Sequence, residues 1–60
     1  MSKQIGMDEQ VVRGAQICVA FWQAQGEESM VMDAQARLDR VLQGTANEVD
    51  IEGALDWLDA

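Results

Sequence analysis

The sequence predicts an all-α protein of three short helices, an antiparallel helical hairpin followed by a C-terminal helix. Apolar residues recur every three or four positions, which is the spacing of one helix face. Proline is absent from the 60 residues, and no stretch keeps the alternation that is typical of strands. Gly26 and Gly44 separate the apolar segments, as expected of residues that end helices.

The first helix is expected over about residues 8–25, with Asp8 as its cap. At 100° per residue, six side chains share an arc of about 120°, here called the main arc. Its members are Val11, Val12, Ala15, Cys18, Val19 and Trp22. Ile17 and Phe21 form a second apolar ridge outside this arc. Gly14 lies beside the ridge, and its missing side chain would let another helix approach closely.

The second and third helices are expected over about residues 30–43 and 50–59. The connection at Gly26 is short, so the first two helices should form an antiparallel hairpin. If Asp50 is the N-cap of the last helix, Val49 and Ala54 occupy its hydrophobic-staple positions.

We expect a flexible tail at residues 1–6 and a single helical domain at residues 7–60. A core of this size supplies only about 3–5 kcal/mol of net stability. Cys18 is the only cysteine and histidine is absent, which excludes an internal disulfide and a Cys/His zinc site. Association is the remaining means of stabilisation, so the chain is expected to be a homodimer or bound to a partner. The alternative is a domain that folds alone, as some of this size do.

The formal charge is −7, from eleven acids against four bases. This charge disfavours direct binding to nucleic acid and to anionic membranes, because both require a basic patch. It favours basic proteins, or sites that normally hold nucleic acid, as partners. No base follows Arg40, and four acids are expected on one flank of the last helix: Glu48, Glu52, Asp56 and Asp59. An open row of this kind does not enclose a cation, so a solvated acidic surface is expected and no metal site.

The longest uninterrupted apolar run, residues 17–22, is far shorter than the roughly 20 residues of a membrane span. No apolar run of signal-peptide length follows Lys3. Together with a free cysteine, these features predict a cytoplasmic protein.

The composition predicts a protein that is not an enzyme. Without histidine or tyrosine, the usual acid–base and nucleophile–base pairs are missing. Cys18 lies in the main arc, and a thiol buried among apolar groups is inert. No cofactor site is expected, and binding remains as the function.

Four apolar residues are the candidates for protein binding: Ile17, Phe21, Met32 and Trp57. Aromatic residues dominate the centres of interfaces, and Phe21 and Trp57 lie off the main apolar faces of their helices. Trp22, the remaining aromatic residue, is expected in the core. The alternatives are that all three aromatic residues are core and that Met32 is an ordinary isolated exposed residue.

Two segments resemble known families. Residues 47–58 resemble the third helix of ubiquitin-associated domains, which are three-helix bundles that bind ubiquitin. The Met-Gly-Phe/Tyr loop of that family is replaced by Gln-Gly-Glu around Gly26. The pair Phe21-Trp22 and the Ala-Leu-Asp-Trp-Leu of residues 54–58 resemble small phage-encoded quorum-sensing anti-activators. That resemblance implies a protein that occupies an interface of a host regulator and disables it.

The function that we expect is therefore that of a small acidic inhibitor, encoded by a phage or another mobile element. It would cover a surface of a host regulator or defence protein in the host cytoplasm. A self-associating structural or adaptor subunit is one alternative. An acidic mimic of nucleic acid is the other.

Overall fold

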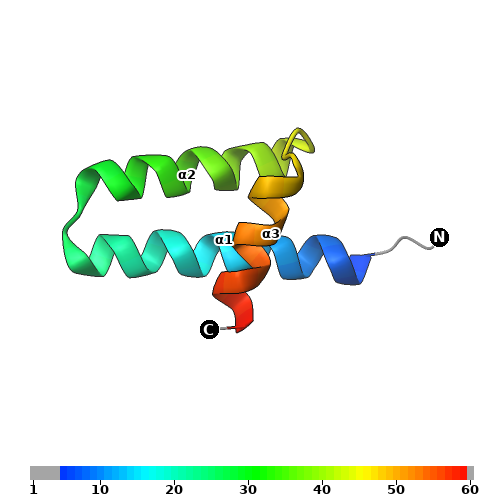
Figure 1. The fold of residues 1–60 in the computed structure, drawn as a ribbon, viewed down its shortest axis with the longest axis horizontal. Helices are drawn as coiled ribbons and strands as arrows, with labels where there is room; N and C mark the ends of the chain where they lie inside the picture. The colour runs from blue at the N-terminus through cyan, green and yellow to red at the C-terminus, as the bar shows by residue number, and fades with distance from the viewer. Residues whose placement is uncertain (1–4, 60) are drawn as a thin grey trace.

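The computed structural model describes the backbone of residues 5–59 and the side chains of residues 9–59. It contains three α-helices, α1 (Ile5–Gln25), α2 (Glu28–Gln43) and α3 (Glu48–Asp59). Figure 1 shows α1 and α2 side by side as an antiparallel hairpin, with α3 crossing α1. The predicted all-α fold of three helices is confirmed.

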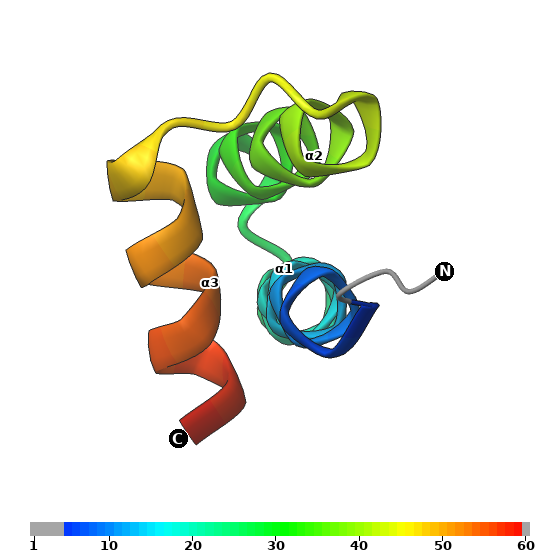
Figure 2. The ribbon, with the colours of Figure 1, turned by 90° about the vertical axis from the view of Figure 1, so that its right-hand side faces the viewer.

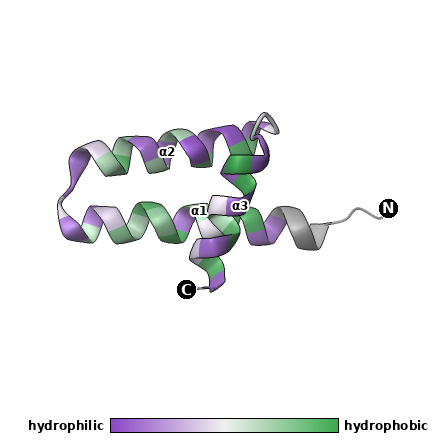
Figure 3. Ribbon diagram, viewed as in Figure 1, coloured by the Kyte–Doolittle hydropathy of each residue, from purple (hydrophilic) through white to green (hydrophobic). Residues whose placement is uncertain are grey.

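Viewed along the hairpin, α3 lies against one side of both other helices (Figure 2). It begins beside α2, passes α1, and its C-terminal end extends beyond α1 on the side away from α2. Figure 3 shows that hydrophobic residues are concentrated in α1 around the crossing with α3, whereas α2 alternates between hydrophilic and hydrophobic residues. None of the described helices combines the length and the apolar character needed to cross a bilayer.

The helices begin earlier than the sequence indicated. Ile5 and Gly6, expected in the flexible tail, belong to α1, and residues 1–4 lie outside the described part of the chain. Asp8 therefore lies within α1 and is not its cap. Helix α2 begins at Glu28, two residues before the expected start.

Gly26 and Gly44 end the first two helices, as predicted. Their φ angles are 75° and 79°, in the left-handed region that L side chains rarely adopt. The backbone N–H of Gly44 donates to the carbonyl of Val41 at 3.2 Å, and that of Thr45 donates to the carbonyl of Arg40 at 2.8 Å. These bonds satisfy carbonyls that the last turn of α2 would otherwise leave open.

The N-cap of α3 is Asn47, so the prediction that Asp50 fills this role is wrong. The backbone N–H of Asp50 donates to Asn47 Oδ1 at 2.9 Å, and the backbone N–H of Asn47 donates to Asp50 Oδ2 at 3.3 Å. This is a capping box in which aspartate replaces the usual glutamate. The staple positions shift accordingly to Ala46 and Ile51, and Val49, expected there, is 71% exposed.

The core is small and lies where the three helices meet. Val11, Ala15 and Ala54 are buried at its centre, and four half-buried residues pack against them: Leu38, Val41, Ile51 and Leu55. Within the described residues, every side chain that is fully buried is small. The interior therefore depends on close approach of backbones more than on large side chains.

The closest approach is between α1 and α3 at Gly14. A Cβ atom there would overlap the carbonyl oxygen of Ala54 and lie 2.6 Å from its carbonyl carbon. The close helix contact expected at Gly14 is thus made by α3 of the same chain and not by a partner. Only glycine allows the two backbones to come this near.

We predict that Gly14→Ala lowers the free energy of unfolding by about 2 kcal/mol, because the added methyl group forces α3 away from α1. In an isolated helix, Gly→Ala would stabilise the helix by about 1 kcal/mol. The destabilisation expected here is therefore opposite to the effect of helix propensity. Urea unfolding followed by circular dichroism measures the difference. Gln16→Ala, at an exposed position of α1, is the control for helix propensity. A Gly14→Ala variant as stable as the parent chain would contradict the prediction.

Candidate protein-binding surface

The three aromatic residues of the chain form one cluster that joins α1 to α3. The ring centroids of Phe21 and Trp22 are 4.9 Å apart at 84°, and those of Phe21 and Trp57 are 5.0 Å apart at 47°. Trp22 and Trp57 are 6.3 Å apart at 73°. Such edge-on and tilted arrangements are favourable for aromatic pairs and add to the effect of burial.

This cluster remains partly open to solvent. Phe21 is 41% exposed, and Ile17, one turn earlier on α1, is 39% exposed. Trp22 and Trp57 are half-buried, so Trp22 is less enclosed than the core position expected for it. We call Ile17, Phe21, Trp22 and Trp57 the aromatic patch.

The patch is a result of the way α3 crosses α1. The contact at Gly14 brings α3 over the middle of α1, and Trp57 lies nearly one turn beyond Ala54 on α3. Trp57 thereby reaches Phe21, two turns beyond Gly14 on α1. Ile17 and Phe21 lie outside the main arc, and the other two helices leave them partly uncovered.

Met32 does not belong to this surface. It lies on α2, 69% exposed, while Ala34 on the same helix is buried. Two residues along a helix correspond to a rotation of about 200°, so Met32 points away from the buried side of α2. Of the four predicted binding residues, the structure brings together Ile17, Phe21 and Trp57.

The acidic row lies on the exposed side of α3. All four of its members are exposed: Glu48, Glu52, Asp56 and Asp59. Among the described residues, no group of three or more acids, cysteines or histidines is arranged to hold a metal ion. The row is therefore a charged surface, and its member Asp56, which precedes Trp57 in the sequence, lies about 100° around α3 from it.

An ion pair between the buried Asp50 and the exposed Arg40 joins α3 to α2 and was not predicted from the sequence. Asp50 is 5% exposed and accepts two hydrogen bonds from Arg40, from Nε to Oδ2 at 2.7 Å and from Nη2 to Oδ1 at 2.8 Å. Arg40 holds the pKa of Asp50 below its usual value by hydrogen bonding, and the same bond raises the pKa of Arg40. In the sequence, the spacing Asn-x-x-Asp at residues 47–50 indicates the capping interaction of Asp50, whereas its pairing with Arg40 has no local signal.

Arg37 adds a second connection between the same two helices. Its Nε is 3.9 Å from Asp50 Oδ1, so it faces α3. A Cβ atom on Gly53 would lie 3.0 Å from Arg37 Cζ and from Nη1. The guanidinium group thus packs against the backbone of α3, and a side chain at Gly53 would displace it.

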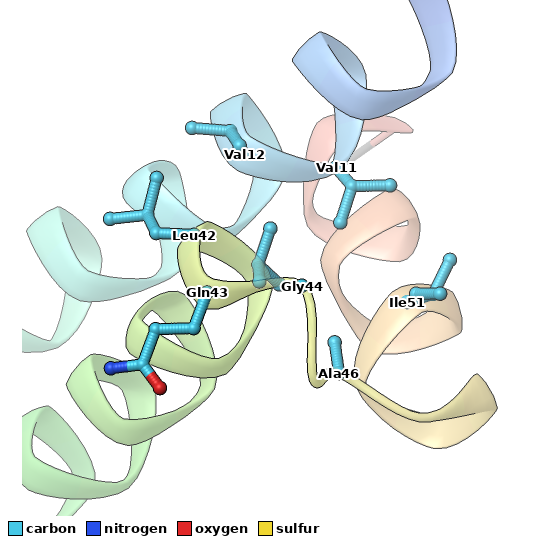
Figure 4. Close-up of a pocket in the computed structure, with 8 residues that line it drawn as sticks. Val11, Val12, Leu42, Gln43, Gly44, Ala46 and Ile51 are labelled. Carbon is cyan, nitrogen blue, oxygen red and sulfur yellow. The ribbon is translucent and has the colours of Figure 1, made fainter.

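A second apolar feature lies where the chain enters α3. An open cleft of about 490 Å³ is lined mainly by apolar side chains (Figure 4). Val12 and Leu42 lie at one side of it and Ile51 at the other. Leu42 is 62% exposed. This cleft is separate from the aromatic patch, since the two share no residue.

We predict that Asp50→Asn destabilises the protein most at neutral pH. The pKa of Asp50 is lower in the folded than in the unfolded chain, so its carboxylate stabilises the fold above about pH 4. That stabilisation is lost as the pH falls through the folded pKa. The difference in free energy of unfolding between parent and variant should therefore shrink below about pH 4. Urea unfolding at a series of pH values tests this, with Asp39→Asn on the exposed side of α2 as the charge control. A difference that does not vary with pH would disprove the role of the carboxylate.

Comparisons with known proteins found no similarity. No family model, no curated protein and no solved structure matches this chain. The function of the chain must therefore be inferred from the aromatic patch, from the charges around it and from the two short sequence resemblances.

Proposed function

We propose that this chain is a non-catalytic protein-binding protein that acts by covering a surface of another protein. The observation that carries this proposal is the exposure of Ile17 and Phe21, about two fifths each, at the edge of the aromatic cluster. Apolar area of this kind gains about 25 cal/mol per Å² when a partner removes it from water. Clustered exposed aromatic residues are typical of the centres of interfaces.

Inhibition is the form of binding that suits a chain of this size. A small domain without catalytic groups changes a partner by blocking access to the surface that it covers. The two segments that resemble phage-encoded anti-activators are Phe21-Trp22 and residues 54–58, and both contribute to the aromatic cluster. This supports a host regulator or defence protein as the class of target, and the host cytoplasm as the place of action.

The two buried reactive groups, Asp50 and Cys18, support a structural role and not a catalytic one. Asp50 is bound by Arg40 and caps the start of α3, so its oxygens are already engaged. Cys18 is buried in the main arc and has apolar neighbours along α1. Neither group is available to a substrate in the described structure.

Self-association is the second candidate function. The cleft beside Leu42 provides a second apolar surface, and a chain with two such surfaces can join copies of itself. Light scattering over a range of concentrations distinguishes the two candidates. A dimer in the absence of other proteins would favour a self-associating subunit, and a monomer would favour the inhibitor.

We predict that Phe21→Asp abolishes capture of a specific partner, because a carboxylate at the centre of the patch must be desolvated on binding. The parent chain, immobilised through a tag, is incubated with lysates of candidate bacterial hosts, and retained proteins are identified by mass spectrometry. Retention of the same protein should fall by at least about tenfold, a loss of about 1.4 kcal/mol.

Met32→Asp is the matched control, because it introduces the same charge at an exposed apolar position on another helix. Circular dichroism verifies that both variants are folded. The proposal fails if Phe21→Asp retains the partner as well as Met32→Asp does.

A further inference from the structure

The charges around the aromatic patch are arranged unevenly. No residue of α1 from 14 to 25 is charged, so the α1 side of the patch is neutral. Asp56 stands next to Trp57 on α3, and Glu52 lies one turn earlier on the same exposed face. Beyond the end of α1, Glu27 is exposed, and its backbone N–H donates to the carbonyl of Trp22 at 3.3 Å. Exposed acids of α3 thus border the patch beside Trp57.

The bases of the described chain do not neutralise this border. Arg40 is bound to Asp50, and Arg37 packs against Gly53 beside the same carboxylate. Arg13 is the base of α1 among the described side chains, and it lies one turn before Ile17. The patch therefore has a positive charge beside Ile17 and negative charges on its α3 side.

From this arrangement we propose that the aromatic patch binds a basic protein surface, in which an apolar side chain is surrounded by lysine or arginine. This inference rests on the proposed function and names the chemistry of the partner. Interfaces combine an apolar centre with a polar rim, and complementary rim charges determine which partner is accepted. The apolar side chain would contact Ile17 and Phe21, and the basic groups would face Asp56 and Glu52.

A second copy of the chain fits this surface less well than a basic partner does. Two patches placed face to face would bring acids from both copies to a shared rim. Among the described side chains, each copy offers Arg13 as the one base near these acids, so most of the described charges that meet would repel. The net charge of −7 adds to this repulsion at longer range.

The test uses an amphipathic helical peptide of leucine and lysine, about four turns long, and a counterpart in which glutamate replaces every lysine. Neither peptide contains tryptophan. Trp22 and Trp57 are the only tryptophans of the protein and both belong to the patch, so their fluorescence reports binding there. We expect the lysine peptide to shift the emission and to bind at least about tenfold more tightly than the glutamate peptide. Its affinity should fall as salt is added.

Two double variants with the same change in net charge separate local from overall electrostatics. Glu52→Gln with Asp56→Asn removes acids beside the patch, and we expect it to lower the affinity for the lysine peptide by about fivefold. Asp33→Asn with Asp39→Asn removes two exposed acids of α2 and should lower the affinity for the lysine peptide by less than about twofold, because it changes only the net charge of the protein. Arg13→Gln should strengthen binding, since it removes the positive charge at the end of the patch.

Three results would overturn the inference. These are equal binding of the two peptides, equal weakening by the two double variants, and the absence of a fluorescence change with the lysine peptide. In each case the proposed function would still be judged by the separate comparison of Phe21→Asp with Met32→Asp in partner capture. Loss of peptide binding with retained capture would reject the basic partner and leave the inhibitor in place.

Discussion

The contact between the backbones of α1 and α3 at Gly14 is the constraint on which the rest of the structure depends. Helix α3 packs mainly on α1, and the three buried residues at the centre of the core come from these two helices. Because Gly14 has no side chain, the carbonyl of Ala54 can approach α1 directly. The crossing point then determines which residues of α1 are covered and which are left at its margin.

The ion pair at Asp50 fixes the start of α3, one turn before this contact. Arg40 comes from the last turn of α2, so its bond to Asp50 holds the end of α2 against the start of α3. The same carboxylate caps α3 through Asn47. One buried group therefore stabilises both the helix and its attachment. With α3 held at its start and at Ala54, the position of Trp57 near its end is largely determined.

The sequence predicts the parts of this structure that depend on local pattern. Helical periodicity and the positions of Gly26 and Gly44 predict the three helices, and the angular separation of Ile17 and Phe21 from the main arc predicts their exposure. Periodicity does not reveal which helix covers a given face. For this reason the close approach at Gly14 could be predicted from the sequence, whereas its occupant, α3 of the same chain, could not.

The burial of Asp50 could not be predicted for a related reason. Arg37 and Arg40 of α2 make a buried carboxylate at Asp50 favourable. Because they lie ten or more residues before Asp50 in the chain, a local sequence pattern does not reveal the interaction. Asp50 and Asn47 are both good capping residues, so the choice between them depends on where α3 meets α2. Met32 lies apart from the other three candidates, and the sequence could not show this because exposure alone does not say whether an apolar residue has apolar neighbours.

The fold itself explains why an apolar ridge stays exposed. Helix α1 has two neighbours, α2 along its length and α3 across its middle, and they lie on two adjoining sides of it, leaving the rest of its surface open (Figure 2). Phe21 gains from contact with Trp57, so part of its apolar surface already contributes to the fold. Ile17 is not among the residues that pack against the buried core, and the outer part of Phe21 remains open to solvent. The exposure of these two side chains is the observation from which binding to another protein is proposed.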